Sequence, residues 1–387
     1  MAVKIVRQAN KIALLGAPTS AAAMSAGHEG APAALRAAGL AERLREIGYD
    51  VTDLGDDPVQ LFKPDEESPR ARNLTRVIAA LEALKPRVEM AVKSSALPLI
   101  LSGDCSIAMA TVAGVRRYFR KVSMIYMDGD ADLNTPATTP SGCVDGMVVS
   151  HLTGRGAAEM VRFWGEPPLV REPDLAIFGV ARLDPPEEQA LAGSPLRRFL
   201  AADVKRMGAS AAARAAIDRI KGNGYQFVLH LDMDVIADCA ATNYPNAGGL
   251  SLDQVREALL IFAQQKELAA LEVTSYNPAK DPDGSGAKLI VELLAEALGA
   301  RLAALKGTEA TVAAPPAAIA AAASQGSSTT GAKNAAPDPE PEPELPAVSA
   351  GEAWSSESLE DSPSDSNSSD DDSGESAGSE ESSGSHS

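Results

Sequence analysis

The chain has 387 residues, and its net charge of −18 is concentrated at one end, because residues 334–387 hold fifteen Asp or Glu and no Lys or Arg. Residues 1–333 therefore carry only −3, which excludes a broad basic surface for nucleic acid. No stretch approaches the ~20 apolar residues of a membrane helix, and the first residues lack a secretory signal pattern. Three widely spaced cysteines argue against a disulfide framework, so we expect a protein of the reducing cytoplasm, without membrane or nucleic-acid partners.

Short apolar segments alternate with amphipathic helical patterns over residues 1–306. This alternation predicts an α/β domain, residues 1–307, with a mostly parallel sheet covered by helices on both faces. The strands are expected at Lys11–Leu15, Val51–Leu54, Leu97–Leu101, Val122–Met127, Leu175–Val180, Phe227–Met233 and Leu271–Ser275. The helices are expected at Ala31–Ile47, Arg72–Val92, Ile107–Arg120, Ser210–Ile220, Leu252–Gln265 and Ala287–Leu305.

Residues 308–387 differ in composition from the rest of the chain. An Ala/Pro/Ser-rich linker leads into an acidic, Ser-rich end. Such a segment buries too little apolar area to offset the entropy of ordering, so we predict that it is disordered. Ser358 and Ser369 each precede an Asp by three residues, a pattern that acidophilic kinases favour, but a solvating tail is the interpretation we prefer.

Acidic side chains follow three of the expected strands, at the edge where parallel sheets bind ligands. Asp104 and Cys105 follow the first of these strands; the other two carry Asp128, Asp130 and Asp132, and Asp232 and Asp234. If these segments are extended, alternate residues share a face, so Asp128, Asp130 and Asp132 point the same way, as do Asp232 and Asp234. If the two strands are neighbours, the five carboxylates would repel one another and take up protons in the absence of an ion, whereas a hard divalent cation such as Mg²⁺, Mn²⁺ or Ca²⁺ would neutralise them. The alternative is that one or two cap helices and the rest are solvated.

The same segments resemble arginase and the wider ureohydrolase family. That family carries Gly-Gly-Asp-His-Ser, then Asp-Ala-His-Ala-Asp with Asn-Thr-Pro, then Asp-x-Asp. The corresponding segments here are Ser102-Gly103-Asp104-Cys105-Ser106, Asp128-Gly129-Asp130-Ala131-Asp132 with Asn134-Thr135-Pro136, and Asp232-Met233-Asp234. Shorter matches, such as Gly30-Ala31-Pro32 and Gly248-Gly249-Leu250, extend the likeness over residues 10–305. The resemblance implies a three-layer α/β/α fold with a central sheet of about eight strands.

Carried over position by position, the resemblance implies two metal ions bridged by Asp128 and Asp232. Asp132 and position 105 would complete the coordination of one ion, and position 130 and Asp234 would complete that of the other. Both family histidine ligands are changed, to Cys105 and Asp130. Asp130 retains a ligand oxygen. Cys105 is either a thiolate ligand or a small buried hydrophobe, and for a hard ion we favour the second.

The groups that act on arginine in the family are also changed. The histidine that assists proton transfer corresponds to Asp145, a carboxylate that can shuttle protons, and the glutamate that binds the guanidinium corresponds to Ser275. Glu272, three residues earlier, would face the other side of the strand. The resemblance assigns substrate contacts to Asn134 and Ser141 for the α-carboxylate, and to Asp184 and Glu187 near the α-amino group.

Further departures concern Cys143, where the family has an asparagine, and Arg182, where it has an acidic residue. Arg182 would either pair with a carboxylate at the rim of the pocket or be an ordinary surface charge, which we prefer. His230 shares strand parity with Asp232 and Asp234. It is either a replacement or supporting ligand or, as we prefer, a hydrogen-bonded core histidine.

Three hypotheses about function follow. The first is an arginase-like pseudoenzyme that binds a divalent cation or an amino acid, or regulates an active paralogue. The second is an active ureohydrolase that releases urea from a guanidino compound with altered metal and substrate preference. The third is an interaction protein that acts through its acidic tail. By resemblance we expect an oligomer, either a homotrimer or homohexamer or a hetero-oligomer with a paralogue.

Overall fold

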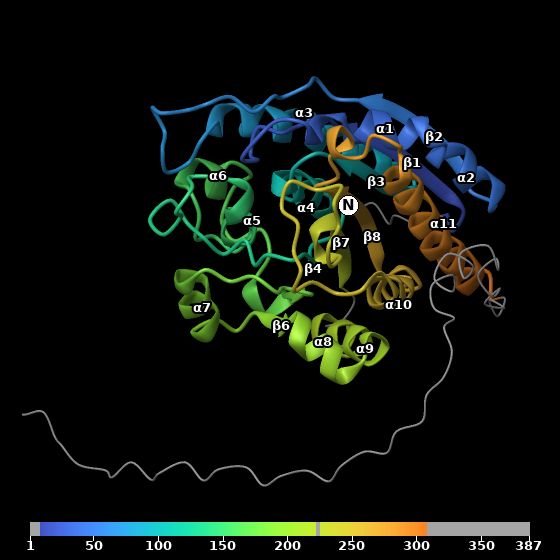
Figure 1. The fold of residues 1–387 in the computed structure, drawn as a ribbon. Helices are drawn as coiled ribbons and strands as arrows, with labels where there is room; N and C mark the ends of the chain where they lie inside the picture. Colours follow the sequence, from blue (N-terminus) through green and yellow to red (C-terminus); the bar gives the residue numbers. More distant parts are fainter. Residues whose placement is uncertain (1–7, 222–224, 308–387) are drawn as a thin grey trace, which may run out of the picture. The chain divides into compact units, whose positions relative to one another are not determined.

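The computed structural model describes residues 8–221 and 225–307. Within them, eight parallel strands form one sheet in the spatial order β2-β1-β3-β8-β7-β4-β5-β6 (Figure 1). The strands are β1 (Lys11–Ala17), β2 (Asp50–Asp56), β3 (Leu97–Ser102), β4 (Val122–Met127), β5 (Leu175–Phe178), β6 (Arg197–Phe199), β7 (Gln226–Asp232) and β8 (Leu268–Thr274). The predicted α/β class and its sheet of about eight strands are confirmed, and the sheet is parallel throughout.

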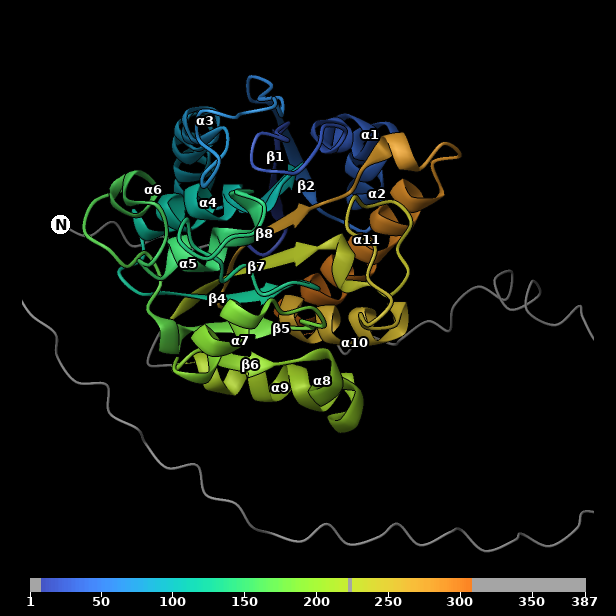
Figure 2. The same ribbon diagram turned by 60° about the vertical axis from the view of Figure 1, so that its left-hand side comes forward.

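Helices cover both faces of the sheet (Figure 2). Side chains of α1, α2 and α8–α11 pack with Ile12 and Leu14 in one apolar core, whereas side chains of α3–α7 pack with Ala13 and Leu15 in the other. This alternation along β1 follows from the two-residue period of a strand. The helices are α1 (Ala31–Ala37), α2 (Leu40–Glu46), α3 (Leu74–Lys93), α4 (Ala108–Arg116), α5 (Val148–Leu152), α6 (Ala158–Arg162), α7 (Pro185–Ala192), α8 (Ala201–Met207), α9 (Ala209–Ile220), α10 (Leu252–Ala263) and α11 (Ser285–Leu305).

Two differences from the prediction have local causes. The predicted helix Ala31–Ile47 is two helices, because Gly39 adopts a left-handed conformation with φ 87° between them. Strand β6 and helices α5–α8 were not predicted, since each is short and β6 begins with two arginines. The predicted disordered tail, residues 308–387, lies outside the described residues. No helix in the described part of the chain combines the length and apolarity needed to cross a membrane.

Candidate metal centre

Four neighbouring strands of the sheet, β3, β8, β7 and β4, end beside one another and supply the site. Since all are parallel, the segments that follow them lie at one edge. Cys105 begins a short 3-10 helix after β3, Asp128 follows β4, and Asp232 ends β7. The predicted convergence of these strand ends is therefore observed.

The acidic segments are not extended, however, which differs from the expectation. Strand β4 ends at Met127, and Asp132 lies in the left-handed region with φ 50°. Its carboxylate accepts a hydrogen bond from the Tyr126 hydroxyl, and Asp132 belongs to neither of the two groups of potential ligands described below. On the other strand, Asp232 Oδ1 accepts the backbone N–H of Asp234 at 2.7 Å and caps a 3-10 helix. Local turns, rather than strand parity, place these side chains.

One group of potential ligands consists of Cys105, Asp128, His230 and Asp232. Each offers a ligand atom, and these four atoms lie within 4.8 Å of one another. All four residues are buried, with at most 3% of their surface exposed. The Cys105 thiol donates to Asp232 Oδ2 at 2.8 Å, and the Ser275 hydroxyl donates to the same oxygen.

His230 lies in a row of side chains that crosses three strands. In the sheet, Tyr126 of β4 and Glu272 of β8 are the register partners of His230 on either side. The Tyr126 ring stacks on the imidazole with centroids 4.1 Å apart, and Glu272 Oε1 lies 2.7 Å from His230 Nδ1. The other ring nitrogen, Nε2, faces Thr274 Oγ1 at 3.3 Å and Asp128 Oδ2 at 3.9 Å. His230 is thus a hydrogen-bonded, fully buried histidine, as we preferred, and one of its nitrogens also faces the carboxylates.

A second group, Asp128, Asp130 and Asp234, is spanned by the side chain of Arg182. The guanidinium donates to both oxygens of Asp130 at 2.7 Å and to Asp234 Oδ2 at 2.8 Å. Its remaining nitrogen donates to the carbonyl oxygens of Tyr244 and Pro245 at 3.1 Å. The preferred interpretation of Arg182 as an ordinary surface charge was wrong, because it pairs with carboxylates of the site.

Backbone geometry explains why Arg182 reaches this position. After β5 the chain turns at Gly179, with φ 96°, and the N–H groups of Ala181 and Arg182 both donate to the carbonyl oxygen of Gly129. These two hydrogen bonds hold the backbone of Arg182 next to Asp130. Burial disfavours the charged guanidinium, but the hydrogen bonds and negative charge of the carboxylates raise the pKa of Arg182 above its usual value.

The electrostatics of the two groups differ. Burial, followed by the charge of Asp232, raises the pKa of Asp128 well above its usual value, and the same two causes raise the pKa of the Cys105 thiol. Burial also raises the pKa of Asp130, but Arg182 opposes that rise. The first group therefore has donor atoms without a compensating cation and fits one metal ion. The second group, although its oxygens are close enough for a ligand set, already has a cation in Arg182 and does not fit a further one.

The remaining acidic residues near the site are held by the protein itself. Asp104 caps the 3-10 helix that starts at Cys105 and accepts hydrogen bonds from Thr19, Ala22 and Ser106. Asp145 Oδ1 accepts the backbone N–H of Cys105 at 2.7 Å. Burial and the charge of Asp104 raise the pKa of Asp145 well above its usual value.

The four predicted substrate contacts lie in two connected loops. The Asn134 amide donates to Asp184 Oδ2 at 2.9 Å, and Ser141 Oγ accepts the backbone N–H of Cys143 at 3.1 Å. Glu187 and Asp184 form the capping box of α7, and Glu187 Oε1 also accepts the N–H of Leu133 at 2.8 Å. Asn134 and Glu187 are buried, Ser141 and Asp184 are half-buried, and all four side chains form hydrogen bonds within the protein.

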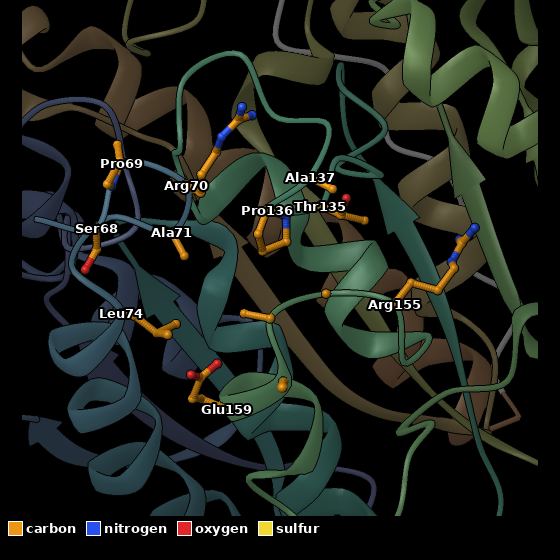
Figure 3. Close-up of a pocket in the computed structure, with 13 residues that line it drawn as sticks. Ser68, Pro69, Arg70, Ala71, Leu74, Thr135, Pro136, Ala137, Arg155 and Glu159 are labelled. Carbon is orange, nitrogen blue, oxygen red and sulfur yellow. The ribbon is translucent and has the colours of Figure 1, made fainter. Parts of the chain in front are cut away.

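A separate cavity of about 550 Å³ lies on the surface between the loop at residues 68–71, the segment 135–137 and α6 (Figure 3). None of its lining residues is one of the carboxylates described above. Its charged lining residues are Arg70, Arg155 and Glu159, and Arg155 points away from Leu74 and Glu159 in Figure 3 while pairing with Glu172 at 3.2 Å. This cavity adds no donor atoms to the metal centre.

Sequence reasoning did not identify the roles of Arg182, Glu272 and Tyr126. Each contacts a site residue from a different strand or loop, so their proximity depends on strand order rather than on spacing along the chain. The sequence held two signals. His230 shares strand parity with Asp232, which indicated that it faces the site, and the change from an acidic residue to arginine at position 182 indicated the ion pair.

Comparisons with known proteins agree with this architecture. The model of the Arginase family matches residues 10–299. The arginase of Bacillus subtilis (strain 168) is 30% identical over 294 residues, covering 75% of this chain and 98% of that protein. The arginase of Bacillus caldovelox is 29% identical over 295 residues, covering 75% and 99%. The crystal structure of arginase from Bacillus cereus superposes with a TM-score of 0.70 at 30% identity, covering 75% of this chain and 98% of that one. This chain therefore belongs to the arginase family.

Proposed function

We propose that the chain is an arginase-family protein that keeps a divalent-cation site but does not hydrolyse arginine. The observation that carries this proposal is the environment of Ser275. By family resemblance, this position would hold the glutamate that binds the substrate guanidinium. Here a fully buried serine donates its hydroxyl to Asp232, and its backbone N–H donates to the carbonyl oxygen of Gly103 at 2.7 Å. The position thus offers no charge to a guanidinium group, and its only hydroxyl is already engaged.

The position of the proton-transferring group supports the same proposal. Asp145 stands where the family has a histidine, and it accepts a hydrogen bond from the Cys105 backbone rather than facing an open space. Efficient acid–base catalysis needs a group that titrates near the working pH and reaches the reacting atoms. Asp145 is buried and its Oδ1 is engaged by the Cys105 backbone, so it does not reach reacting atoms and its role is positional.

Arg182 also opposes the binding of arginine near the metal centre. Its guanidinium already forms the bidentate pair with Asp130 that an incoming guanidinium would seek. Two guanidinium groups at one carboxylate would repel each other. Conversely, the retained buried carboxylates Asp128 and Asp232, with no compensating charge of their own, favour a cation.

Urea release from L-arginine by the full-length chain, supplied with Mn²⁺, Co²⁺, Ni²⁺ or Zn²⁺, tests the proposal. The matched control is the double variant Asp128→Ala with Asp232→Ala, which removes Asp128 from both ligand groups and Asp232 from the first. We expect the two proteins to release urea at the same background rate, while the Bacillus subtilis arginase serves as the positive control. Urea release from arginine above the double variant would refute the proposal.

The second hypothesis, hydrolysis of a different guanidino compound, is tested by the same assay with a panel of substrates that differ in the α-carboxylate and α-amino groups. The half-buried side chains of Ser141 and Asp184 favour this alternative, because they lie at predicted contacts for the α-carboxylate and the α-amino group. Regulation of an active paralogue is the cellular role that we propose for a protein without turnover. Mixed assembly of the two chains, measured by size-exclusion chromatography with light scattering, would support that role.

A further inference from the structure

The first ligand group contains donor types that hard cations do not select. It combines the sulfur of Cys105, the imidazole Nε2 of His230 and carboxylate oxygens of Asp128 and Asp232, all within 4.8 Å of one another. Thiolate and imidazole ligands suit Zn²⁺ and related ions, whereas Mg²⁺, Mn²⁺ and Ca²⁺ prefer oxygen ligands alone. A site with one sulfur, one nitrogen and two oxygen donors is complete for a four-coordinate ion.

His230 is oriented as metal-binding histidines are. Its Nδ1 lies 2.7 Å from Glu272 Oε1, and with the proton on Nδ1 the lone pair of Nε2 faces Asp128. A carboxylate on the far nitrogen fixes the tautomer and raises the basicity of the ligating nitrogen in many metal sites. The stacked Tyr126 ring, inclined by only 2° to the imidazole, restrains its rotation. Both supports come from neighbouring strands, so the geometry is rigid.

Cys105 is held at the same centre by independent contacts. Its sulfur lies 2.8 Å from Asp232 Oδ2 and 3.2 Å from Thr274 Oγ1, and its backbone N–H is anchored on Asp145. The Cys105 thiol and the Asp232 carboxylate share one proton, and a cation that binds both groups can replace that proton. Binding would form the metal–sulfur bond and release the thiol proton to solvent.

Arg182 occupies the second group of potential ligands. Its guanidinium is within 2.8 Å of oxygens from Asp130 and Asp234 and thereby occupies the position between them with a permanent positive charge. A metal ion there would have to displace a bidentate ion pair and would lie beside the displaced cation. The number of ions that the centre accepts is therefore reduced from the two of the family pattern.

We propose that this chain binds a single Zn²⁺-class cation through Cys105, Asp128, His230 and Asp232, and that Arg182 replaces a second ion at Asp130 and Asp234. This inference rests on the cation site of the proposed function and specifies its ligands, its stoichiometry and its metal class. It departs from the preference for a hard ion drawn from the carboxylates alone, because His230 and Cys105 complete the ligand set.

The ligand part is tested with the full-length chain, stripped of metal by a chelator and titrated with Co²⁺ as an optical probe and with Zn²⁺ by calorimetry. We expect one ion per chain, a sulfur-to-cobalt charge-transfer band, and proton release that accompanies binding. The band should disappear in Cys105→Ser and persist in the control Cys239→Ser, whose cysteine is outside the ligand group. His230→Gln should weaken Zn²⁺ at least tenfold, and Glu272→Gln by about 10- to 100-fold.

Several results would overturn this part. They are a charge-transfer band that persists in Cys105→Ser, tighter binding of Mn²⁺ than of Zn²⁺, or no binding of either ion by the stripped chain. Circular dichroism of every variant shows whether it folds, and Cys105→Ala replaces Cys105→Ser if the latter does not. Urea release, measured on the same samples, reports separately on the proposed lack of hydrolysis, so the two proposals fail independently.

The role of Arg182 has its own test. Arg182→Met keeps the length of the side chain but removes the charge, which frees Asp128, Asp130 and Asp234 for an ion. We expect the stoichiometry to rise from one to two Co²⁺ or Mn²⁺ ions per chain, whereas Arg182→Lys, which keeps the charge, should remain at one. A wild-type chain that binds two ions, or a folded Arg182→Met chain that still binds one, would show that Arg182 does not replace an ion.

Discussion

The buried His151 makes a prediction about acid stability that can be worked out in magnitude. His151 lies on α5 with 1% of its surface exposed, and neither ring nitrogen has a hydrogen-bond partner among the described groups. Burial lowers its pKa from 6.5 to about 4. Above pH 6.5 the ring is neutral in both the folded and the unfolded chain and contributes no pH dependence.

As the pH falls from about 6.5 to about 4, the unfolded chain binds a proton at His151 and the folded chain does not. The free energy of unfolding then falls by about 1.4 kcal/mol per pH unit, which amounts to about 3 kcal/mol in all. Below about pH 4 both states are protonated and the loss stops. The variant His151→Leu has no proton to bind, so it should lose about 3 kcal/mol less than the wild type between neutral pH and pH 4.

Urea denaturation at several pH values measures this difference. Other titrating groups are common to both proteins and cancel in the comparison. Val149→Ala is the matched control, because it changes a fully buried side chain of the same helix that does not titrate. Its stability should be offset from the wild type by a constant amount. If the curves for the wild type and His151→Leu run parallel, the folded protein accommodates the charged ring and the reasoning is wrong.

Two further predictions concern the support of the site. A Cβ atom on Gly103 would lie 1.8 Å from the carbonyl oxygen of Thr19, so Gly103→Ala should cost about 1–3 kcal/mol or more in thermal unfolding, whereas Gly146→Ala, which meets no atom within 4 Å, should cost far less. Burial raises the pKa of Asp281, but hydrogen bonds at the start of α11 lower it overall. Asp281→Asn should therefore lower the free energy of unfolding by about 1–2 kcal/mol near neutral pH. The difference from the wild type should shrink below about pH 4, where the wild-type carboxylate is protonated.

The sequence predicted the fold class and the convergence of the carboxylates for a physical reason. Parallel strands covered on both faces are continuous apolar runs, and the polar residues that follow them lie at one edge. Asp128, which follows β4, and Asp232, which ends β7, could therefore both be placed at that edge from the sequence. Their proximity also required that the two strands be neighbours, as the structure shows.

What the sequence could not predict depends on strand order and on single backbone angles. His230 meets Glu272 because β7 and β8 are neighbours in a register that places the two residues side by side. The separation of 42 residues along the chain gives no indication of it. Asp132 departs from the predicted alternation through one positive φ, and Arg182 reaches Asp130 through hydrogen bonds to the carbonyl oxygen of Gly129.

The changes at positions 130 and 182 are best understood as one exchange. The family pattern combines a histidine at position 130 with an acidic residue at position 182, and this chain has Asp130 with Arg182. Either change alone would be unfavourable. An aspartate without the arginine would add an unpaired, half-buried negative charge beside Asp128 and Asp234, and an arginine opposite a metal-bound histidine would repel the metal ion. Together they form a bidentate pair without net charge, in which Arg182 supplies a positive charge beside Asp130 and Asp234. The pairing therefore favours a centre rebuilt around a different cation arrangement.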